Sequence, residues 1–482
     1  MASREVFKLL VIVSLFWSVY SEEIDNPFGF YRHEAPRISS TKSALATWDV
    51  YYAQVDNFND KDNSTFAMRY NYNLQFCQQD GCPLVIYVGG DWEINERWLK
   101  PGQIYEIGRE NGAAMFYTEH RFYGKSMPTT DFTSESLRLL HSSQAQEDLK
   151  GFIMMLKEFD RYKNSKVMLF GCSYAGGLVA WMKQKYPELI QVTYSTGGPF
   201  YAKDSMFEYL QVISRMIYNL PNIGKQCFDG LFYGIQQLEQ EYDSGPEGAA
   251  SVIKKLGICP PYDPKGDYDK AAVFQTFGVE FGNMGQEDSK KLPYACNRLI
   301  NAKGETYAEK LVNYRTNGTT PIFCYYTDYD STAARYADTS LNGKQRPWFY
   351  QQCNEFGWFQ TTETNTQVFG KSVLPFFYHQ LCRDAYGAAF TDENILLAQE
   401  NTNKVYGGYT PNVRKSVFVY GSIDPWAPMG VQESLNDEAL TFYIQGGGHC
   451  WDMFPQSIED SKSMTYAKVN SRAWVKKWLS ED

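Results

Sequence analysis

The stretch Lys166–Gly177, KVMLFGCSYAGG, decides the fold. It begins with a short apolar run that is typical of a fully buried strand. The next residues, Leu178–Pro187 (LVAWMKQKYP), have a helical pattern. Ser173 therefore sits in a sharp turn between a strand and a helix, where small neighbours lift the hydroxyl above the edge of a sheet. This context favours Ser173 as a nucleophile, although Ala175 stands where the strict G-x-S-x-G pattern has glycine.

Other short apolar runs predict further strands of the same sheet. They are Pro83–Gly90, Ala113–Thr118, Gln191–Thr196, Ser416–Gly421 and Leu440–Gln445. Helical patterns lie between them, most clearly at Ser143–Phe159. Strands that alternate with helices indicate an α/β protein with a parallel sheet.

A serine hydroxyl needs a base, and in hydrolases built on such a sheet the histidine comes last in the chain. Only two histidines, His379 and His449, follow Ser173. His449 comes after a predicted strand and three glycines, in a loop at the carboxyl edge of the sheet, where such sites assemble. His379 lies in an aromatic stretch, FFYHQLC, that is more typical of a structural histidine. We therefore predict His449 as the base.

The acid that orients the base is expected directly after the preceding strand. Asp424 follows the run Ser416–Gly421 closely and is the candidate, while Asp437 and Asp452 do not directly follow a strand. The alternative for Asp424 is a residue that only forms a turn before proline. The oxyanion hole is expected at the backbone N–H of Tyr174, the residue after the nucleophile, and in the turn Gly89-Gly90-Asp91, at Gly90 or Asp91.

The region 201–393 breaks the alternation of strands and helices. It contains short helical patterns such as Met206–Tyr218 and six of the ten cysteines. We read it as an inserted unit crosslinked by disulfides, and Cys77 and Cys82 are placed to close a small separate loop. The predicted sheet domain then comprises residues 22–200 and 394–482.

Composition excludes several classes of protein. An apolar share of 43% in 482 residues is enough for a well-packed globular chain of two units. Acidic residues outnumber basic ones by 56 to 46, without a cluster of basic and aromatic residues, so we expect no nucleic-acid partner. The chain has no C-x-x-C or H-E-x-x-H pattern, and we expect no metal and no cofactor.

The N-terminus has the layout of a signal peptide. Arg4 and Lys8 precede an apolar run at Leu9–Val19, and cleavage is expected near Ser21. The alternative, a membrane anchor, is disfavoured because spanning a bilayer takes roughly 20 apolar residues. Sequons at Asn63 and Asn317 agree with passage through a glycosylating compartment, although chance alone would supply one or two. We therefore predict a secreted or lysosomal protein with residues 1–21 removed.

Four segments together resemble one peptidase family. They are GCSYAG at 171–176, EHRFYGKS at 119–126, DPW at 424–426 and HCWDMFP at 449–455. The family contains lysosomal Pro-X carboxypeptidase, dipeptidyl peptidase II and thymus-specific serine protease. The segment WFYQQCNEFGWFQT at 348–361 is most similar to the thymus-specific branch.

The resemblance implies an α/β-hydrolase fold with a helical, disulfide-rich cap inserted after the nucleophile, and a triad of Ser173, Asp424 and His449. It implies a serine exopeptidase that cuts peptides after proline, and a homodimer, since family members often pair. Asp91-Trp92 departs from the Glu-Gly common in the family, which bears on the pocket for the terminal group. Cys172 and Cys450 flank two of these triad residues, and we hypothesise a disulfide between them that would hold the turn at Ser173 against the loop at His449.

Two other functions remain open on these residues. The same triad would serve a secreted esterase or lipase, and a hydrolase scaffold can also be kept by a catalytically silent binding protein. The sequence also leaves open whether the amino or the carboxyl terminus of a peptide is trimmed.

Overall fold

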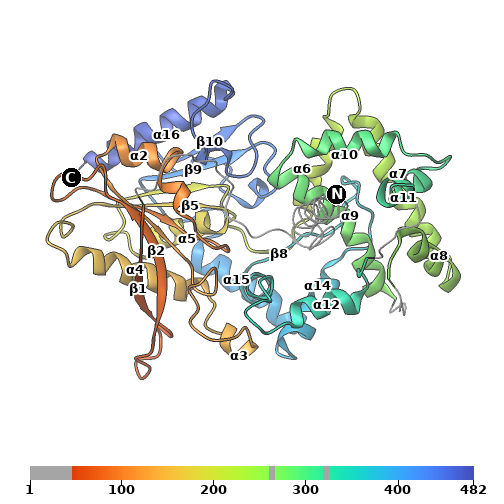
Figure 1. The fold of residues 1–482 in the computed structure, drawn as a ribbon, viewed down its shortest axis with the longest axis horizontal. Coiled ribbons are helices and arrows are strands. Elements are labelled where there is room, and N and C mark those ends of the chain that lie inside the picture. The colour runs from red at the N-terminus through yellow and green to blue at the C-terminus, as the bar shows by residue number, and fades with distance from the viewer. Residues whose placement is uncertain (1–45, 260–265, 319–324, 482) are drawn as a thin grey trace, which may run out of the picture.

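The computed structural model describes residues 46–259, 266–318 and 325–481 (Figure 1). The expected signal peptide, residues 1–21, lies outside this part of the chain. The strands are β1 (Thr47–Gln54), β2 (Thr65–Asn73), β3 (Leu84–Val88), β4 (Ala114–Thr118), β5 (Val167–Cys172), β6 (Val192–Thr196), β7 (Lys203–Ser205), β8 (Gly357–Phe359), β9 (Ser416–Gly421) and β10 (Ala439–Ile444). All six strands expected from apolar runs are therefore present.

The helices fall into two groups by position in the chain. Those that precede β6 or follow β10 are α2 (Gln103–Glu110), α3 (Ser134–Leu137), α4 (Ser142–Lys157), α5 (Tyr174–Lys185) and α16 (Lys462–Ser480). Those between β6 and β9 are α6 (Phe207–Tyr218), α7 (Gly224–Tyr242), α8 (Pro246–Leu256), α9 (Asp267–Glu287), α10 (Lys291–Ile300), α11 (Tyr307–Thr316), α12 (Tyr329–Ala337), α13 (Arg346–Gln351), α14 (Pro375–Tyr386) and α15 (Asp392–Tyr406). A single π-helical turn, η2 (Gln352–Phe356), continues α13.

The main sheet has eight strands in the order β1-β2-β4-β3-β5-β6-β9-β10. The six strands from β4 to β10 in this order pair in parallel, so their carboxyl ends lie at one edge. The strand β5, which leads into Ser173, lies near the middle of the sheet. This edge is where side chains from separate loops can converge.

The expectation of a parallel sheet needs a correction at one end. β1 pairs antiparallel with β2, and β2 pairs antiparallel with β4, so the sheet is mixed. These two strands were missed as apolar runs because exposed and buried residues largely alternate in β2, and most of β1 is exposed. An antiparallel edge ribbon can leave one face to water, whereas a central parallel strand cannot.

Both faces of the central strands are buried, which explains their unbroken apolar sequences. In β3, Leu84, Ile86 and Val88 belong to one core, and Val85 and Tyr87 belong to another on the opposite face. The first core lies on the side of α4 and α5, and the second on the side of α2 and α16. This three-layer arrangement holds the carboxyl edge of the sheet rigidly.

The segment between β6 and β9 is largely helical, and its helices from α6 to α11 form the right-hand part of Figure 1. Disulfides join Cys227 to Cys296, between α7 and α10, and Cys353 to Cys382, between η2 and α14. Cys259 is also disulfide-bonded. The α/β-hydrolase fold with a helical, disulfide-rich insertion after the nucleophile is thus confirmed. The exact domain limits, 22–200 with 394–482 and 201–393, remain a prediction.

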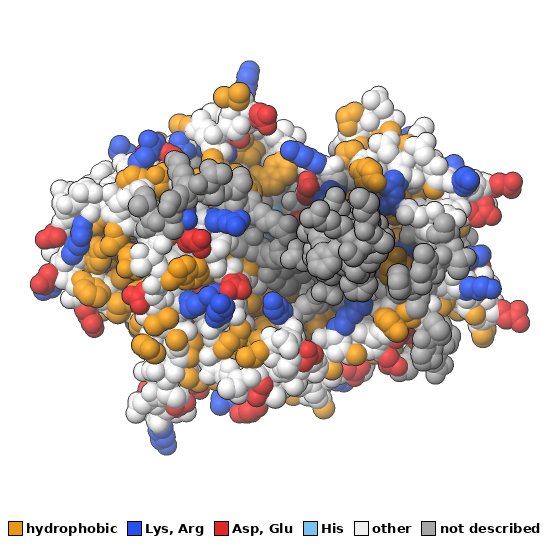
Figure 2. Space-filling model, in the orientation of Figure 1, with side chains coloured by type: hydrophobic (Ala, Val, Ile, Leu, Met, Phe, Trp, Pro, Cys, Tyr) orange, Lys and Arg blue, Asp and Glu red, His pale blue; other side chains and the backbone are white. Residues whose placement is uncertain are grey.

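The surface carries charges of both signs. On the face drawn in Figure 2, Lys and Arg side chains are interspersed with Asp and Glu. Within the described residues, no helix combines the length and hydropathy that crossing a bilayer would take.

Candidate active site

Ser173 occupies the turn between β5 and α5 in a conformation that few residues adopt. Its φ is 55° and its ψ is −135°, and it is the N-cap residue of α5. The backbone N–H of Ser173 donates to the carbonyl oxygen of Thr196, at the end of β6, over 2.9 Å. The neighbouring strand therefore helps to hold the strained turn in place. Such strain concentrates at functional sites.

The turn leaves no room for side chains at its glycines. A Cβ atom on Gly171 would lie 2.2 Å from the carbonyl oxygen of Ala175. One on Gly176 would lie 2.8 Å from Oγ of Ser195 and 3.0 Å from Cα of Gly198. Alanine at 175, the departure from the usual pattern, is accommodated because that side chain is buried in the core under α5. The glycine requirement falls on positions 171 and 176.

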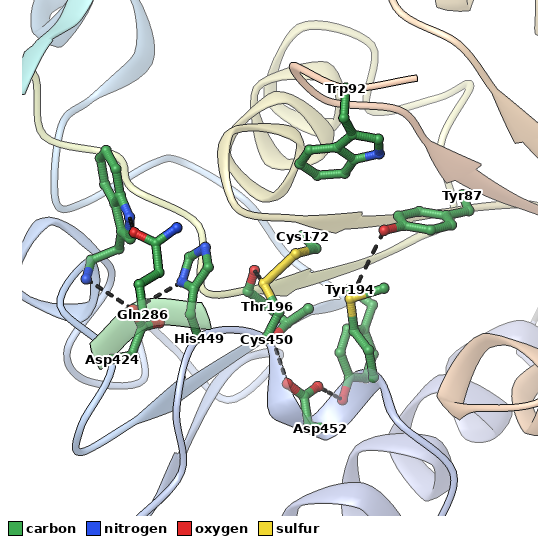
Figure 3. The surroundings of a disulfide bond; sticks show 12 residues. Tyr87, Trp92, Cys172, Tyr194, Thr196, Gln286, Asp424, His449, Cys450 and Asp452 are labelled. Atoms are coloured by element: carbon green, nitrogen blue, oxygen red, sulfur yellow. Dashed lines mark hydrogen bonds and ion pairs between the residues drawn. A yellow bond between two sulfur atoms is a disulfide. The ribbon is translucent and has the colours of Figure 1, made fainter. Parts of the chain in front are cut away.

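His449 and Asp424 meet at the carboxyl edge of the sheet. Nδ1 of His449 lies 2.9 Å from Oδ1 of Asp424, as Figure 3 shows. The same oxygen accepts from the backbone N–H of Trp426 over 2.8 Å. Asp424 is only 1% exposed. A carboxylate can only accept, so Nδ1 of His449 carries the proton and Nε2 keeps a lone pair.

Nε2 of His449 is the free nitrogen of this pair. It is buried and makes no hydrogen bond to any described residue, Ser173 included. Hydrogen bonds between catalytic groups are often long before a substrate binds and tighten in the complex. The arrangement therefore leaves an imidazole lone pair available to accept a proton.

A disulfide joins the residue before Ser173 to the residue after His449. It links Cys172 and Cys450, whose Cα atoms are 6.1 Å apart, and it confirms the pairing hypothesised from the sequence (Figure 3). A ring nitrogen of His449 lies within 4.8 Å of both sulfur atoms. A Cβ on Gly197 would lie 2.9 Å from Nδ1 of His449 and 3.0 Å from the sulfur of Cys450. The turn at Ser173 and the loop at His449 are thus packed together.

The other candidate histidine and acids have partners elsewhere. His379, on α14, places Nε2 2.7 Å from Asp204, and its pKa is raised by that carboxylate and by Asp392, against the effect of burial. Asp452 accepts from the hydroxyls of Tyr194 and Thr196, and burial raises its pKa. The other acid, Asp437, is exposed and forms an ion pair with Arg414 over 3.3 Å.

The predicted oxyanion groups come from two elements. Tyr174 is the first residue of α5, and the first N–H groups of a helix have no partner within it. Gly90 and Asp91 lie in the loop after β3, next to Gly89, whose N–H donates to the Thr118 carbonyl over 2.9 Å. Both groups come from the carboxyl ends of adjacent strands, because β3 pairs with β5. Their role in binding an oxyanion remains a prediction.

Trp92 is buried in the loop after β3 that holds Gly90 and Asp91, the predicted oxyanion loop. Its indole N–H donates to the hydroxyl of Tyr117 over 2.8 Å, and the side chain is 4% exposed. A Cβ on Gly90 would lie 2.8 Å from the Trp92 ring. The bulk introduced by this departure from the family pattern is therefore packed under the loop, and it requires glycine at 90.

A buried group of polar side chains next to Ser173 was not anticipated from the sequence. The Tyr174 hydroxyl lies 3.1 Å from Nε2 of His120 and 3.1 Å from the side-chain nitrogen of Gln351. Gln351 accepts in turn from the Tyr123 hydroxyl over 2.5 Å. His120 and Tyr123 lie in the segment EHRFYGKS, and Gln351 lies in WFYQQC. The resemblance to the family had marked both segments, but it did not indicate that these side chains contact Tyr174.

The two sequons are accessible. Asn63 is exposed in the turn between β1 and β2, and Asn317 is exposed at the end of α11, where its side-chain oxygen also accepts from Arg298 over 2.7 Å. Glycosylation of either residue remains a prediction.

Comparison with known proteins identifies the family. The family model for serine carboxypeptidase S28 matches residues 53–470. Human thymus-specific serine protease is 29% identical over 444 residues, covering 88% of this chain and 85% of its own. Mouse lysosomal Pro-X carboxypeptidase is 24% identical over 453 residues, covering 89% of each. Among solved structures, a proline iminopeptidase of Mycobacterium smegmatis aligns with 12% identity and a TM-score of 0.40, over 90% of this chain and 100% of its own. The chain belongs to the serine carboxypeptidase S28 family and is a serine-type peptidase.

Proposed function

We propose that the protein is a secreted or lysosomal exopeptidase that removes carboxy-terminal residues from peptides, with a preference for cleavage after proline. The preference and the choice of terminus rest on the family description and on the name of the Pro-X carboxypeptidase relative. The paired cysteines agree with an oxidising compartment. One observation carries the chemistry: the His449–Asp424 pair is crosslinked through Cys450 to the residue beside Ser173.

The proposed reaction starts with Ser173. Its hydroxyl gives its proton to Nε2 of His449 while Oγ bonds to the carbonyl carbon of the scissile peptide. Asp424 holds the imidazole in the required tautomer and stabilises the imidazolium that forms. The backbone N–H of Tyr174, with that of Gly90 or Asp91, donates to the oxyanion.

The tetrahedral intermediate then breaks down. The C–N bond is cleaved as His449 returns the proton to the leaving nitrogen, and an acyl-enzyme on Ser173 remains. A water molecule attacks this ester, with His449 again taking and returning a proton, and the acid product leaves. All steps use side chains and backbone of the described residues, and the proposal needs no cofactor.

Matched peptides test both the reaction and the terminus. An N-acetylated peptide with proline as its penultimate residue should lose one carboxy-terminal residue, as detected by mass spectrometry. The same peptide with a C-terminal amide should react more slowly, and alanine in place of proline should reduce kcat/KM. Release of amino-terminal dipeptides from unblocked peptides only would contradict the carboxypeptidase assignment. Hydrolysis of short acyl esters alone would favour an esterase.

A further inference from the structure

A chain of buried hydrogen bonds surrounds the hydroxyl of Tyr174, the residue that follows the nucleophile. Its members come from three separate parts of the chain: His120 and Tyr123 from the loop after β4, Tyr174 from the start of α5, and Gln351 from the end of α13. Each is at most 4% exposed. These hydrogen bonds therefore link the turn at Ser173 to a helix of the insertion.

The direction of each hydrogen bond follows from its partners. Nδ1 of His120 lies 2.7 Å from the carbonyl oxygen of Arg121, which can only accept, so Nδ1 carries the proton. Nε2 of His120 then accepts from the Tyr174 hydroxyl. The Tyr174 oxygen in turn accepts from the Gln351 amide nitrogen, and the Gln351 oxygen accepts from Tyr123. Each of these hydrogen bonds then has one donor and one acceptor, and this order requires a neutral imidazole at His120.

The surroundings of His120 favour that neutral form. Burial lowers its pKa to about 4, and the charged groups that act on it are Asp148 from α4, Asp91 from the oxyanion loop and Arg121. Burial is the largest effect on the pKa; the hydrogen bond to the Arg121 carbonyl and the two carboxylates raise the pKa, and the charge of the Arg121 guanidinium lowers it. His120 thus stays neutral at neutral and mildly acidic pH.

Aromatic side chains enclose the rest of Tyr174. Its ring centroid lies 5.4 Å from that of His120, 5.8 Å from Trp348, 5.5 Å from Phe356 and 6.5 Å from Trp181. These side chains fill the space around the Tyr174 ring, and the hydrogen bonds of its hydroxyl fix the orientation of the ring within that space. Because the same residue carries a predicted oxyanion N–H, the position of the ring bears on the position of that donor.

We propose that His120 is a positioning residue that acts through the Tyr174 hydroxyl, together with Gln351, to set the first N–H of α5 against the developing oxyanion. This inference rests on the proposed function. His120 does not touch the substrate in this account. A misplaced donor weakens binding of the transition state more than binding of the substrate, so the loss falls on kcat rather than KM.

The test compares single variants in the full-length secreted protein. Tyr174→Phe removes the hydroxyl and keeps the ring, and we expect kcat for a proline peptide to fall about tenfold or more with KM changed less than about threefold, since losing an oxyanion donor outright costs roughly 10²–10³ in kcat. His120→Ala should lower kcat by a similar factor. His120→Gln, whose side-chain oxygen can accept near the position of Nε2, should recover much of the lost rate.

Tyr406→Phe is the matched control. The Tyr406 hydroxyl is also buried and hydrogen-bonded to two side chains, Ser142 and Gln146, and its ring stacks on Trp181 at 4.3 Å. This variant should lose stability without losing kcat. Active-site titration with a fluorophosphonate normalises each rate to the amount of competent enzyme.

The outcomes separate this inference from the proposed function. A wild-type protein without peptidase activity, or one whose activity survives Ser173→Ala, overturns the proposed function. A wild-type protein that depends on Ser173, together with a Tyr174→Phe variant that keeps kcat within about twofold, overturns the inference alone. An equal kcat loss in Tyr406→Phe also overturns it, because the effect would then follow from any buried hydroxyl.

Discussion

Cys172 and Cys450 are separated by 278 residues in the sequence and joined by a disulfide at the carboxyl edge of the sheet. Cys172 directly precedes Ser173, and Cys450 directly follows His449. A crosslink at this place limits how far the loops that carry Ser173 and His449 can move apart, and the proposed reaction needs these two residues to stay close together.

Replacing both cysteines with serine should reduce both stability and activity. Because the closed loop is long, we expect the double variant Cys172→Ser/Cys450→Ser to lose about 2–5 kcal/mol of unfolding free energy. The control is Cys77→Ser/Cys82→Ser, which opens a disulfide with a sequence separation of only 5. Urea unfolding and kcat/KM are measured for both. Equal activity losses in the two double variants would contradict a special role for the Cys172–Cys450 bond.

Asp424→Asn should remove most of the activity while leaving the fold intact. An amide in place of the carboxylate can hold His449 in the wrong tautomer, and in a serine protease triad this change lowers kcat by about 10⁴. Asp437→Asn, at an exposed acid close in sequence, serves as the control and should keep its activity. Initial rates on a proline peptide measure both. An Asp424→Asn variant within tenfold of wild type would exclude Asp424 as the orienting acid.

The nucleophile turn should not tolerate a methyl group at position 171. A Cβ there would meet a backbone oxygen at 2.2 Å, so Gly171→Ala must shift the turn and should cost about 1–3 kcal/mol, with loss of probe labelling. In α9, Gly278→Ala places its Cβ 3.4 Å from Leu210, an ordinary contact, and should be neutral or stabilising. Thermal unfolding and fluorophosphonate labelling test the pair. Normal labelling of Gly171→Ala would contradict the geometry of the turn.

His379 should make the protein more stable at acidic than at alkaline pH. Its pKa is raised in the folded state by Asp204 and Asp392, so the stabilisation is full below the unfolded pKa of about 6.5 and is lost as pH rises through the folded pKa. His379→Asn should therefore lower Tm more at pH 5.5 than at pH 8.5. Asp204→Asn should show the same pH-dependent fall in Tm, and the double variant should lower Tm little further than either single variant. Equal shifts in Tm at both pH values would contradict the ion pair.

Local sequence patterns were sufficient for the central sheet and the loops at its edge. β3, β5 and β9 are buried on both faces and therefore read as unbroken apolar runs. Ser173 and Asp424 closely follow two of these runs, and His449 follows β10, which also reads as an apolar run although it is partly exposed. β1 and β2 were missed because a half-exposed antiparallel ribbon has no such run. Their mixed pattern also hid the change from parallel to antiparallel pairing.

The contacts around Tyr174 could not be predicted in the same way. His120 is 54 residues before Tyr174 and Gln351 is 177 residues after it. No period or turn signal encodes a hydrogen bond over such a separation, because it depends on how the insertion packs against the sheet. The Cys172–Cys450 pair could be hypothesised only because the two cysteines flank Ser173 and His449, which were already predicted to meet.

The most direct test of the central claim is to locate the residue that a fluorophosphonate modifies in the folded protein. The account predicts one adduct, on the peptide that contains Ser173, with labelling abolished in Ser173→Ala and strongly reduced in His449→Ala. Labelling at another serine, or unchanged labelling of folded His449→Ala, would contradict the claim that Ser173 and His449 act together.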